Sequence, residues 1–443
     1  MADDFARSRF RRALSLSKLG ARVAIGQGKR LIARDEADVH RELAATLVGE
    51  LGKLKGLPMK IGQILSYMDG VVPEEYEAIY QDLLGQLRTH SQPMSAQAWR
   101  AVFEEELGRT PEEVFDSFEP EPIASASIGQ VHRAVLDGVA VCFKVQYPGV
   151  AEATAADLEN IETIVALMRR VMPKIDTRQM VHDFRDRLAE ECDYRIEASY
   201  QRRFADIYRD HETLMVPGVI DHLSTRRILT TVFVQGVGLD SFVASASAAE
   251  RDRAGAALYR FAFGSLLRHG LFHADPHPGN LLFDADGTGK LCVLDYGCVQ
   301  PIDEAARRDI AALLRAALAG RGLEAPARLA LGITEMDEAT GAAVTEIVEH
   351  VLSPITNPQP HRFTRAFAAD ISRAVIEAKA SLASRYVTRR GVFKADREGV
   401  MFVVRNLFGL ATLWGTLEAR GDFRALTREL LEESVDLRHD ALL

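Results

Sequence analysis

The spacing of hydrophobic residues predicts helices along most of the chain and strands in a few short regions. Residues 130–136 and 139–146 are strand-like runs joined by Asp137-Gly138, a dipeptide typical of a two-residue hairpin turn. Residues 281–283 and 290–294 form a second strand-like pair around a glycine-containing turn. The pattern therefore predicts a small antiparallel sheet and, further along the chain, a separate β-pair.

Helical spacing dominates the rest of the chain. It covers residues 36–90, 93–108, 151–209, 248–269 and 303 to the end. Two further strand-like runs occupy residues 215–220 and 227–234. The predicted order is helices, a small sheet, helices, a short β-pair and helices, which indicates a mixed fold with helical additions at both ends.

The composition is that of an ordinary globular protein, with 47% hydrophobic and 26% charged residues. The four cysteines show no Cys-x-x-Cys spacing, which argues against a zinc ribbon or a disulfide framework. The most apolar run, residues 399–417, carries Arg405 and Asn406 at its centre and is therefore a poor membrane span. A net charge of −9 gives no support for nucleic-acid binding.

The charge is distributed unevenly along the chain. Residues 1–34 carry nine Lys/Arg and two Asp, a local excess of +7, interleaved with hydrophobic residues. A basic, amphipathic segment before an acidic body is typical of binding to an anionic surface such as a lipid headgroup layer. We expect a cytoplasmic protein associated peripherally with membrane. A mitochondrial location stays open, because the Arg and Ser content of this segment loosely suits a transit peptide.

The strongest functional motif is His273-Ala-Asp275-Pro-His-Pro-Gly-Asn280, followed by Asp295-Tyr-Gly at the end of an apolar run. Protein kinases have the same spacing in their catalytic loop and in the metal-binding Asp that follows it. Phosphoryl transfer needs a divalent cation held against the β- and γ-phosphates. Asp295 and Asn280 can hold Mg²⁺ through hard oxygen atoms. Asp275 would then orient the attacking hydroxyl or water.

Two other interpretations of this motif are possible. A histidine two residues before an aspartate often marks a loop turn and nothing more, but Asn280 and Asp295 in register make this interpretation weak. A hydrolytic metal centre could use His273, Asp275 and His277. No further histidine lies nearby at suitable spacing, which disfavours it.

A second signal lies upstream, in the strand-like run that contains Lys144. A lysine within an apolar strand is costly unless it is paired, and kinases place their phosphate-binding lysine there. Alternatively, Lys144 simply extends its amine to solvent from an edge strand. The residues before the hairpin, where a kinase has its glycine-rich loop, are small: Ala124, Ser125, Ala126 and Ser127. Small side chains let backbone N–H groups approach phosphate, although the loop should be stiffer than a glycine loop.

Element order and motifs together predict an α+β, two-lobed protein-kinase-like fold with an N-terminal helical extension and a helix-rich C-terminal region. We expect the helical extension to cover residues 1–110. The N-lobe is expected over residues 111–235 and the C-lobe over residues 236–443. ATP and Mg²⁺ are the expected cofactors.

Six runs of residues resemble motifs of the UbiB (ADCK) family of atypical kinases. They are Lys60–Gln63, Ala124–Ala134, Lys144–Val150, Glu191–Ala198, His273–Asn280 and Leu294–Gly297. Each run alone is a modest signal, but together they are highly specific. Five of the six lie within residues 124–297, and the first extends the resemblance back to residue 60.

The resemblance implies roles for individual residues. Lys144 resembles the lysine that binds the ATP phosphates, with Glu197 as its helix partner and Glu191 as the rival candidate. The resemblance also implies that Val232 and Val234, at the end of the run 227–234, contact the nucleotide.

The resemblance further implies a regulatory element. Lys60 and Gln63 resemble an inhibitory signature that lies over the active site in this family, and their i, i+3 spacing places them on one helix face. Glu191 and Asp193 resemble the Glu-x-Asp pair, to which Lys60 could pair. Taken alone, Lys60–Gln63 would more simply be part of an amphipathic surface helix.

The sequence departs from ordinary protein kinases after Asp295. It has no Ala-Pro-Glu element and no Ser/Thr-rich activation segment, and proceeds directly to Pro301 and a predicted helix. The resemblance implies an ATP-dependent atypical kinase or ATPase that supports isoprenoid quinone (ubiquinone) biosynthesis. Its expected partners are an anionic membrane surface or a lipid-like quinone precursor, with quinone-biosynthesis proteins as further candidates. The alternatives are a nucleotide-binding pseudokinase scaffold and, less favoured, an ordinary protein kinase.

Overall fold

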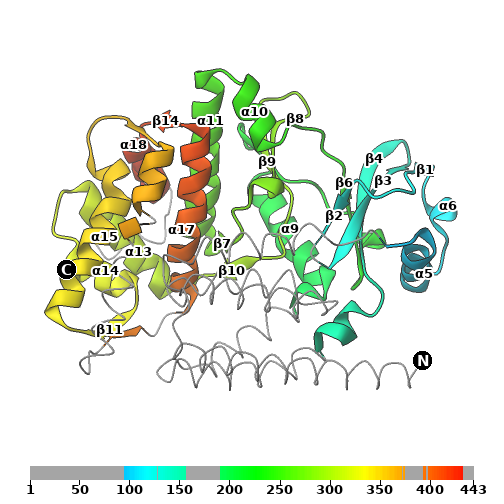
Figure 1. Ribbon diagram of the computed structural model, residues 1–443, viewed down its shortest axis with the longest axis horizontal. Helices are drawn as coiled ribbons and strands as arrows, with labels where there is room; N and C mark the ends of the chain where they lie inside the picture. The colour runs from blue at the N-terminus through cyan, green and yellow to red at the C-terminus, as the bar shows by residue number, and fades with distance from the viewer. Residues whose placement is uncertain are drawn as a thin grey trace, which may run out of the picture. The chain divides into compact units, whose positions relative to one another are not determined.

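The computed structural model describes residues 94–155, 190–374, 393–395 and 398–432, except Ser127 and Ser372 (Figure 1). The helices expected over residues 36–90 lie outside this part of the chain, and so do residues 156–189 of the helical region expected over 151–209. The described residues form two compact units. The first contains the described residues up to Ala198 together with Val219–Phe233, and the second contains Ser199–Gly218 together with those from Val234 onward.

The first unit is built on a five-stranded antiparallel sheet. Its strands are β1 (Ser117–Phe118), β2 (Ala124–Ser125), β3 (Gly129–Leu136), β4 (Val139–Gln146) and β6 (Ile228–Val232). The order is β1-β3-β4-β6. β2 pairs with the N-terminal end of β3, and β1 pairs with its C-terminal end. Asp137 and Gly138 both have positive φ, 49° and 76°, as a type I′ turn requires. The hairpin predicted from this dipeptide is therefore confirmed.

Helix α5 (Ala96–Leu107) packs on this sheet (Figure 1). Its buried residues Trp99, Val102 and Phe103 repeat at the i, i+3, i+4 spacing of one helix face. Together with Phe115 and Phe143 they form an aromatic core, in which the Phe115 and Phe143 rings stack at 5.2 Å. The short helix α6 (Pro111–Val114) follows with a capping box at Thr110.

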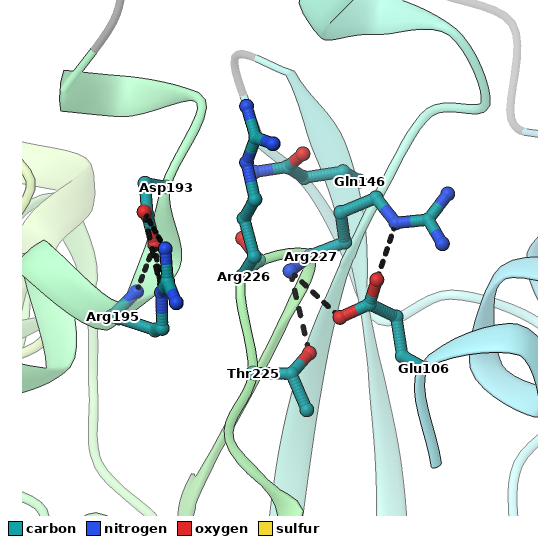
Figure 2. Close-up of polar contacts among 7 residues, drawn as sticks. All are labelled: Glu106, Gln146, Asp193, Arg195, Thr225, Arg226 and Arg227. Carbon is teal, nitrogen blue, oxygen red and sulfur yellow. Dashed lines mark hydrogen bonds and ion pairs between the residues drawn. The ribbon is translucent and has the colours of Figure 1, made fainter. Parts of the chain in front are cut away.

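The C-terminal end of α5 is tied to the start of β6 through Arg227 (Figure 2). Arg227 Nε donates to Glu106 Oε1 at 2.7 Å, and its guanidinium also lies 3.0 Å from Glu105 Oε2. Burial would raise the pKa of Glu106, but hydrogen bonds from Thr225 and Arg227 hold it below its ordinary value. These bonds hold the C-terminal end of α5 beside β6, and packing in the aromatic core holds its buried face against the sheet.

The second unit is mainly helical. Its helices are α10 (Leu239–Ser245), α11 (Ala248–Tyr259), a π-helical turn (Arg260–Gly264), α12 (Ser265–His269), α13 (Glu304–Leu318), α14 (Glu324–Ala330), α15 (Glu338–Thr356), α17 (Glu398–Leu417) and α18 (Phe423–Glu432), while α9 (Tyr194–Ile207) begins in the first unit. The helix expected over residues 248–269 is confirmed as the continuous run from α11 to α12. Helix α17 contacts α11 within this unit (Figure 1).

Short strands complete the second unit. They are β5 (Leu214–Met215), β7 (Leu271–His273), β8 (Leu281–Ala285), β9 (Lys290–Val293), β10 (Val299–Pro301), β11 (Ile333–Met336), β12 (His361–Arg362), β13 (Phe393–Ala395) and β14 (Arg420–Gly421). The pair β8–β9 confirms the second predicted β-pair, and β5 joins it alongside β9. The strand expected over residues 215–220 stops at Met215. Pro217 has no N–H to donate, which accounts for the early end.

None of the helices in the described part of the chain is long and apolar enough to cross a bilayer. The apolar run 399–417 belongs to α17, whose buried residues include Leu410, Trp414 and Leu417. Trp414 Nε1 donates to the Gly255 carbonyl at 3.0 Å. The hydrophobicity of α17 is thus used in the core of the second unit.

One buried histidine makes the first unit sensitive to pH. His132 is fully buried and stacks on Phe143, with ring centroids 5.1 Å apart. Its Nδ1 donates to the Glu119 carbonyl at 3.1 Å, so Nε2 accepts from the Gln130 amide at 2.7 Å. Burial lowers the pKa of His132 below its ordinary value, because the charged ring would be desolvated.

We predict that acid destabilises the protein through His132. The unfolded chain protonates this ring near pH 6.5, whereas the folded chain keeps it neutral to lower pH. The stabilisation is complete above about pH 6.5 and is lost as the pH falls toward the folded-state pKa, at up to about 1.4 kcal/mol per pH unit. The free energy of unfolding in urea, determined for wild type and His132→Gln at two pH values, measures this loss. Subtracting one protein's value from the other's at each pH removes the contribution of the titrating groups that both proteins share.

His132→Gln should be the less stable protein, since it disturbs both hydrogen bonds. The difference between the free energies of unfolding of the two proteins should be smaller at pH 5.5 than at pH 7.5, by at most about 1.4 kcal/mol. An equal gap at both pH values would contradict the assignment.

Candidate active site

In the first unit, Lys144 pairs with Glu197. Lys144 lies on β4, and its Nζ is 3.1 and 3.0 Å from the two carboxylate oxygens of Glu197, in the first turn of α9. The side chains are only 15% and 7% exposed, so the pair is largely removed from water. Of the two partners proposed from the sequence, the structure places Glu197 against the lysine. Lys144 Nζ also lies 5.0 Å from the centre of the Tyr194 ring, at cation–π distance.

The start of α9 is anchored to the sheet, which fixes Glu197. The backbone N–H of Tyr194 donates to the Arg226 carbonyl at 2.9 Å. Tyr194 and Ala198 pack with Leu229 of β6 in a small buried cluster. Tyr194 precedes Glu197 by three residues, so both side chains project from one face of the helix. Sequence reasoning missed this tyrosine, although that spacing could have indicated it.

The Ala/Ser segment forms a tight hairpin. Ala124 and Ser125 pair with Val131 and Gln130, and the Ala126 N–H donates to the Gly129 carbonyl at 2.9 Å. Ser127 lies outside the described residues. A Cβ on Gly129 would lie 2.2 Å from the Val145 carbonyl oxygen, so only glycine fits there. The turn is thereby held against β4, the strand that carries Lys144.

In the second unit, the catalytic-loop residues are brought together by hydrogen bonds. β7 ends at His273, and the loop turns back on itself through a bond from His277 N to the Asp275 carbonyl and one from Asn280 N to the His277 carbonyl. The Asn280 side-chain amide then donates to Asp275 Oδ2 at 2.9 Å. The loop therefore presents Asp275 and Asn280 side by side.

Asp295 is attached to this loop by backbone bonds. His273 is 6% exposed, and its Nε2 donates to the Asp295 carbonyl at 2.6 Å. Leu294 N donates to the Asn280 carbonyl at 2.9 Å, and Gly297 N donates to Asp295 Oδ1 at 2.8 Å. His273 thus positions the segment that carries Asp295. Sequence reasoning identified His273 only as part of the motif, because the atom it binds is a main-chain oxygen.

The donor set of Asn280 and Asp295 suits a hard cation. Only N–H can donate to Asp275, so the Asn280 carbonyl oxygen is the atom turned away from that carboxylate. An amide oxygen and a carboxylate are ligands that Mg²⁺ prefers. The rival metal centre is not supported, because His273 Nε2 and His277 Nδ1 bond to main-chain groups. The described residues hold no cluster of three or more His, Cys, Asp or Glu arranged for a metal.

The remaining predicted residues lie in several places. Asp193 precedes α9, and its carboxylate accepts from Arg195 N and Nε at 3.0 and 2.9 Å (Figure 2). These bonds hold the pKa of Asp193 below its ordinary value. Glu191 is half-buried just before it. Lys60 and Gln63 lie outside the described residues.

The two valines expected to contact the nucleotide fall in different units. Val232 is the last residue of β6 and pairs with Val141 in the sheet of the first unit. Val234 is buried against Ala285 and Cys292 in the second unit.

Fold and site together define a protein-kinase-like protein. Comparison with known families supports this: residues 86–321 match the ABC1 atypical kinase-like domain. The chain therefore belongs to the ABC1 atypical kinase-like family, which confirms the predicted fold class and the resemblance to UbiB and ADCK proteins.

Several relatives carry names of the same kind. The chain is 33% identical to protein ACTIVITY OF BC1 COMPLEX KINASE 8 of Arabidopsis thaliana, a chloroplastic protein, over 299 residues that are 66% of this chain and 38% of that one. It is 32% identical to the mitochondrial atypical kinase COQ8B of Rattus norvegicus over 256 residues, 57% of this chain and 47% of the relative. The chain thus spans less than half of the length of these two relatives.

A solved structure also matches. Rv3197 of Mycobacterium tuberculosis, determined in complex with erythromycin, superposes with a TM-score of 0.63 at 28% identity. The match covers 89% of this chain and 97% of that one. Two further relatives carry kinase names, abkB of Dictyostelium discoideum and COQ8B of Danio rerio, in agreement with the match to the kinase-like domain.

We predict that Asp295→Asn weakens Mg-ATP binding about tenfold or more and removes turnover, because the carboxylate expected to bind Mg²⁺ loses its charge. Nucleotide affinity measured across a Mg²⁺ titration checks this. The exposed Asp240 on α10, in the same unit, provides Asp240→Asn as a matched control that should behave as wild type. Asp295→Asn with unchanged Mg²⁺ dependence and unchanged turnover would rule out the metal-binding role.

Proposed function

We propose that this protein is a Mg-ATP-dependent atypical kinase or ATPase. The observation that carries the proposal is the Lys144–Glu197 pair, a lysine amine held by both carboxylate oxygens of a helix residue. In protein kinases an ion pair of this kind must form before phosphoryl transfer can occur. The Asp275–Asn280 bond in the second unit supports the same assignment, since a scaffold without chemistry has no need of an oriented carboxylate there.

Each residue has a distinct task in this proposal. Lys144 donates to the nucleotide phosphates, and Glu197 keeps its ammonium in place. Asn280 and Asp295 hold Mg²⁺, which neutralises charge on the β- and γ-phosphates when bound. Asp275 orients the acceptor hydroxyl or water and takes up its proton. The Ala/Ser hairpin offers backbone N–H groups to phosphate oxygens.

The chain after Asp295 favours a small acceptor or water over a protein substrate. Val299 begins β10, which pairs with β7, and Asp303 then caps α13 through a bond from Ala306 N. All residues between Asp295 and α13 are described, and the only regular element among them is the three-residue strand β10, so no long segment is left for a substrate peptide. This supports a small-molecule kinase or an ATPase.

We place this activity at a membrane surface, in support of isoprenoid quinone biosynthesis. The basic excess of +7 in residues 1–34 supports contact with anionic lipid. A lipid-like quinone precursor is the proposed acceptor or effector, and a cytoplasmic, peripherally bound location is proposed with it. Lys60 and Gln63 are proposed to cover the part of the active site at which the phosphoryl acceptor would bind. Lys60 would pair with Glu191 or with Asp193, whose charge Arg195 already partly balances.

We predict that anionic liposomes and quinone-precursor mimics stimulate ATP turnover by the full chain. Deleting residues 1–34 should reduce both stimulation and liposome flotation, because each Lys/Arg near an anionic leaflet contributes about 1 kcal/mol. Raising the salt concentration should have the same effect, since it screens the attraction. Phosphate release and mass analysis of all components measure turnover and identify any phosphorylated acceptor.

The same assay separates the alternatives. ATP bound without hydrolysis or transfer under any of these conditions would indicate a pseudokinase scaffold. Phosphate found only on added proteins would indicate an ordinary protein kinase. Lys60→His should alter turnover in this assay if Lys60 covers the site. Equal flotation of the full and shortened chains on anionic liposomes would contradict the membrane role.

A further inference from the structure

The imidazole of His277 lies on the catalytic loop, yet the roles assigned above do not use it. The ring is exposed and is flanked by Pro276 and Pro278, which restrict the backbone on both sides. Its Nδ1 accepts a hydrogen bond from the Gly279 backbone N–H at 3.0 Å. His277 thereby caps the short 3₁₀ turn Pro278–Asn280. An exposed side chain held in this way is pre-oriented toward a ligand.

The orientation of the ring is tightly specified. A Cβ on Gly279 would lie 3.0 Å from His277 Nδ1 and 3.2 Å from Cε1, so glycine is what allows the ring to lie over this turn. Because Nδ1 accepts a hydrogen bond, the neutral ring carries its proton on Nε2. The loop therefore presents an N–H donor at the outer edge of the imidazole.

A helix cap alone does not require histidine. Asn, Asp and Ser are the preferred caps, and each supplies an acceptor atom without extending beyond it. Two other side-chain donors of the loop already bond within the protein, since His273 Nε2 donates to the Asp295 carbonyl and the Asn280 amide donates to Asp275. Ala274, between His273 and Asp275, supplies no cation where protein kinases have arginine. A phosphoryl group beside Asp275 needs a donor to balance its charge, and His277 can provide one.

We propose that His277 Nε2–H donates a hydrogen bond to an oxygen of the phosphoryl group being transferred, which makes His277 a further catalytic residue; this rests on the proposed Mg-ATP-dependent function. In that step the acceptor oxygen forms a bond to the γ-phosphorus while the bond from this phosphorus to the β–γ bridging oxygen breaks. The electron pair leaves with ADP, and the acceptor proton passes to Asp275. His277 forms and breaks no covalent bond.

His277 lies between Asp275 and Asn280 in the same loop, and main-chain bonds connect the three residues. His277 N lies 2.7 Å from the Asp275 carbonyl, and Asn280 N lies 3.0 Å from the His277 carbonyl. The three residues are thus held on two consecutive turns of one closed loop. Removing a single donor to charge that develops in a transition state typically lowers turnover by about 100-fold.

Two substitutions separate this role from capping. His277→Asn keeps a side-chain acceptor for the Gly279 N–H but lacks the outer donor, and His277→Lys keeps an outer donor but no cap. We expect His277→Asn to lower kcat about 10- to 100-fold. Its KM for Mg-ATP, Mg-ADP affinity and thermal stability should stay near wild type. His277→Lys should recover much of kcat. His222→Asn, at an exposed histidine in the 3₁₀ turn Asp221–Leu223 of the first unit, is the matched control.

The outcomes are distinguishable. His277→Asn with wild-type kcat shows that His277 is a cap only and overturns the proposal. Equal losses of stability, Mg-ADP affinity and kcat in both variants show a structural role and also overturn it. A wild-type chain that binds no Mg-ATP contradicts the proposed function itself, whereas the first two results leave that function intact.

Discussion

The first unit is organised around an ammonium group that must be kept in a largely buried position. Lys144 lies within the eight-residue strand β4, and its side chain is only 15% exposed. An isolated charge there would be costly, so the strand is compatible with lysine only when a counter-charge is held beside it. Glu197 supplies this charge. The pairing of β4 with β6 and the anchoring of α9 on β6 are the structural conditions for it.

The polar site of the second unit is held together differently, by hydrogen bonds. Its functional side chains are positioned mainly by bonds to the main chain, as with His273 on the Asp295 carbonyl and Gly297 N–H on the Asp295 carboxylate. Main-chain partners cannot rotate away, so Asp295 keeps its orientation before any ligand arrives. Such pre-organisation is what electrostatic catalysis of phosphoryl transfer requires.

Sequence reasoning identified the elements in which local chemistry is decisive. Asp137-Gly138 specified the main hairpin because both residues must adopt positive φ, and the spacing of Asp275, Asn280 and Asp295 specified the polar site of the second unit. It did not identify β1, β7 or β10, which are two or three residues long and exist only because a partner strand lies beside them. The choice between Glu191 and Glu197 also depended on where α9 begins, which the Tyr194–Arg226 backbone bond decides.

The most direct test of this account is a double-mutant cycle on Lys144 and Glu197, with Mg-ATP affinity as the readout. If the ion pair presents the lysine to the phosphates, Lys144→Met and Glu197→Gln should each weaken binding about tenfold or more. The double variant should then bind no more weakly than Lys144→Met alone, because both changes remove one interaction. Losses that simply add, or a Glu197→Gln protein that binds Mg-ATP as wild type does, would contradict the account.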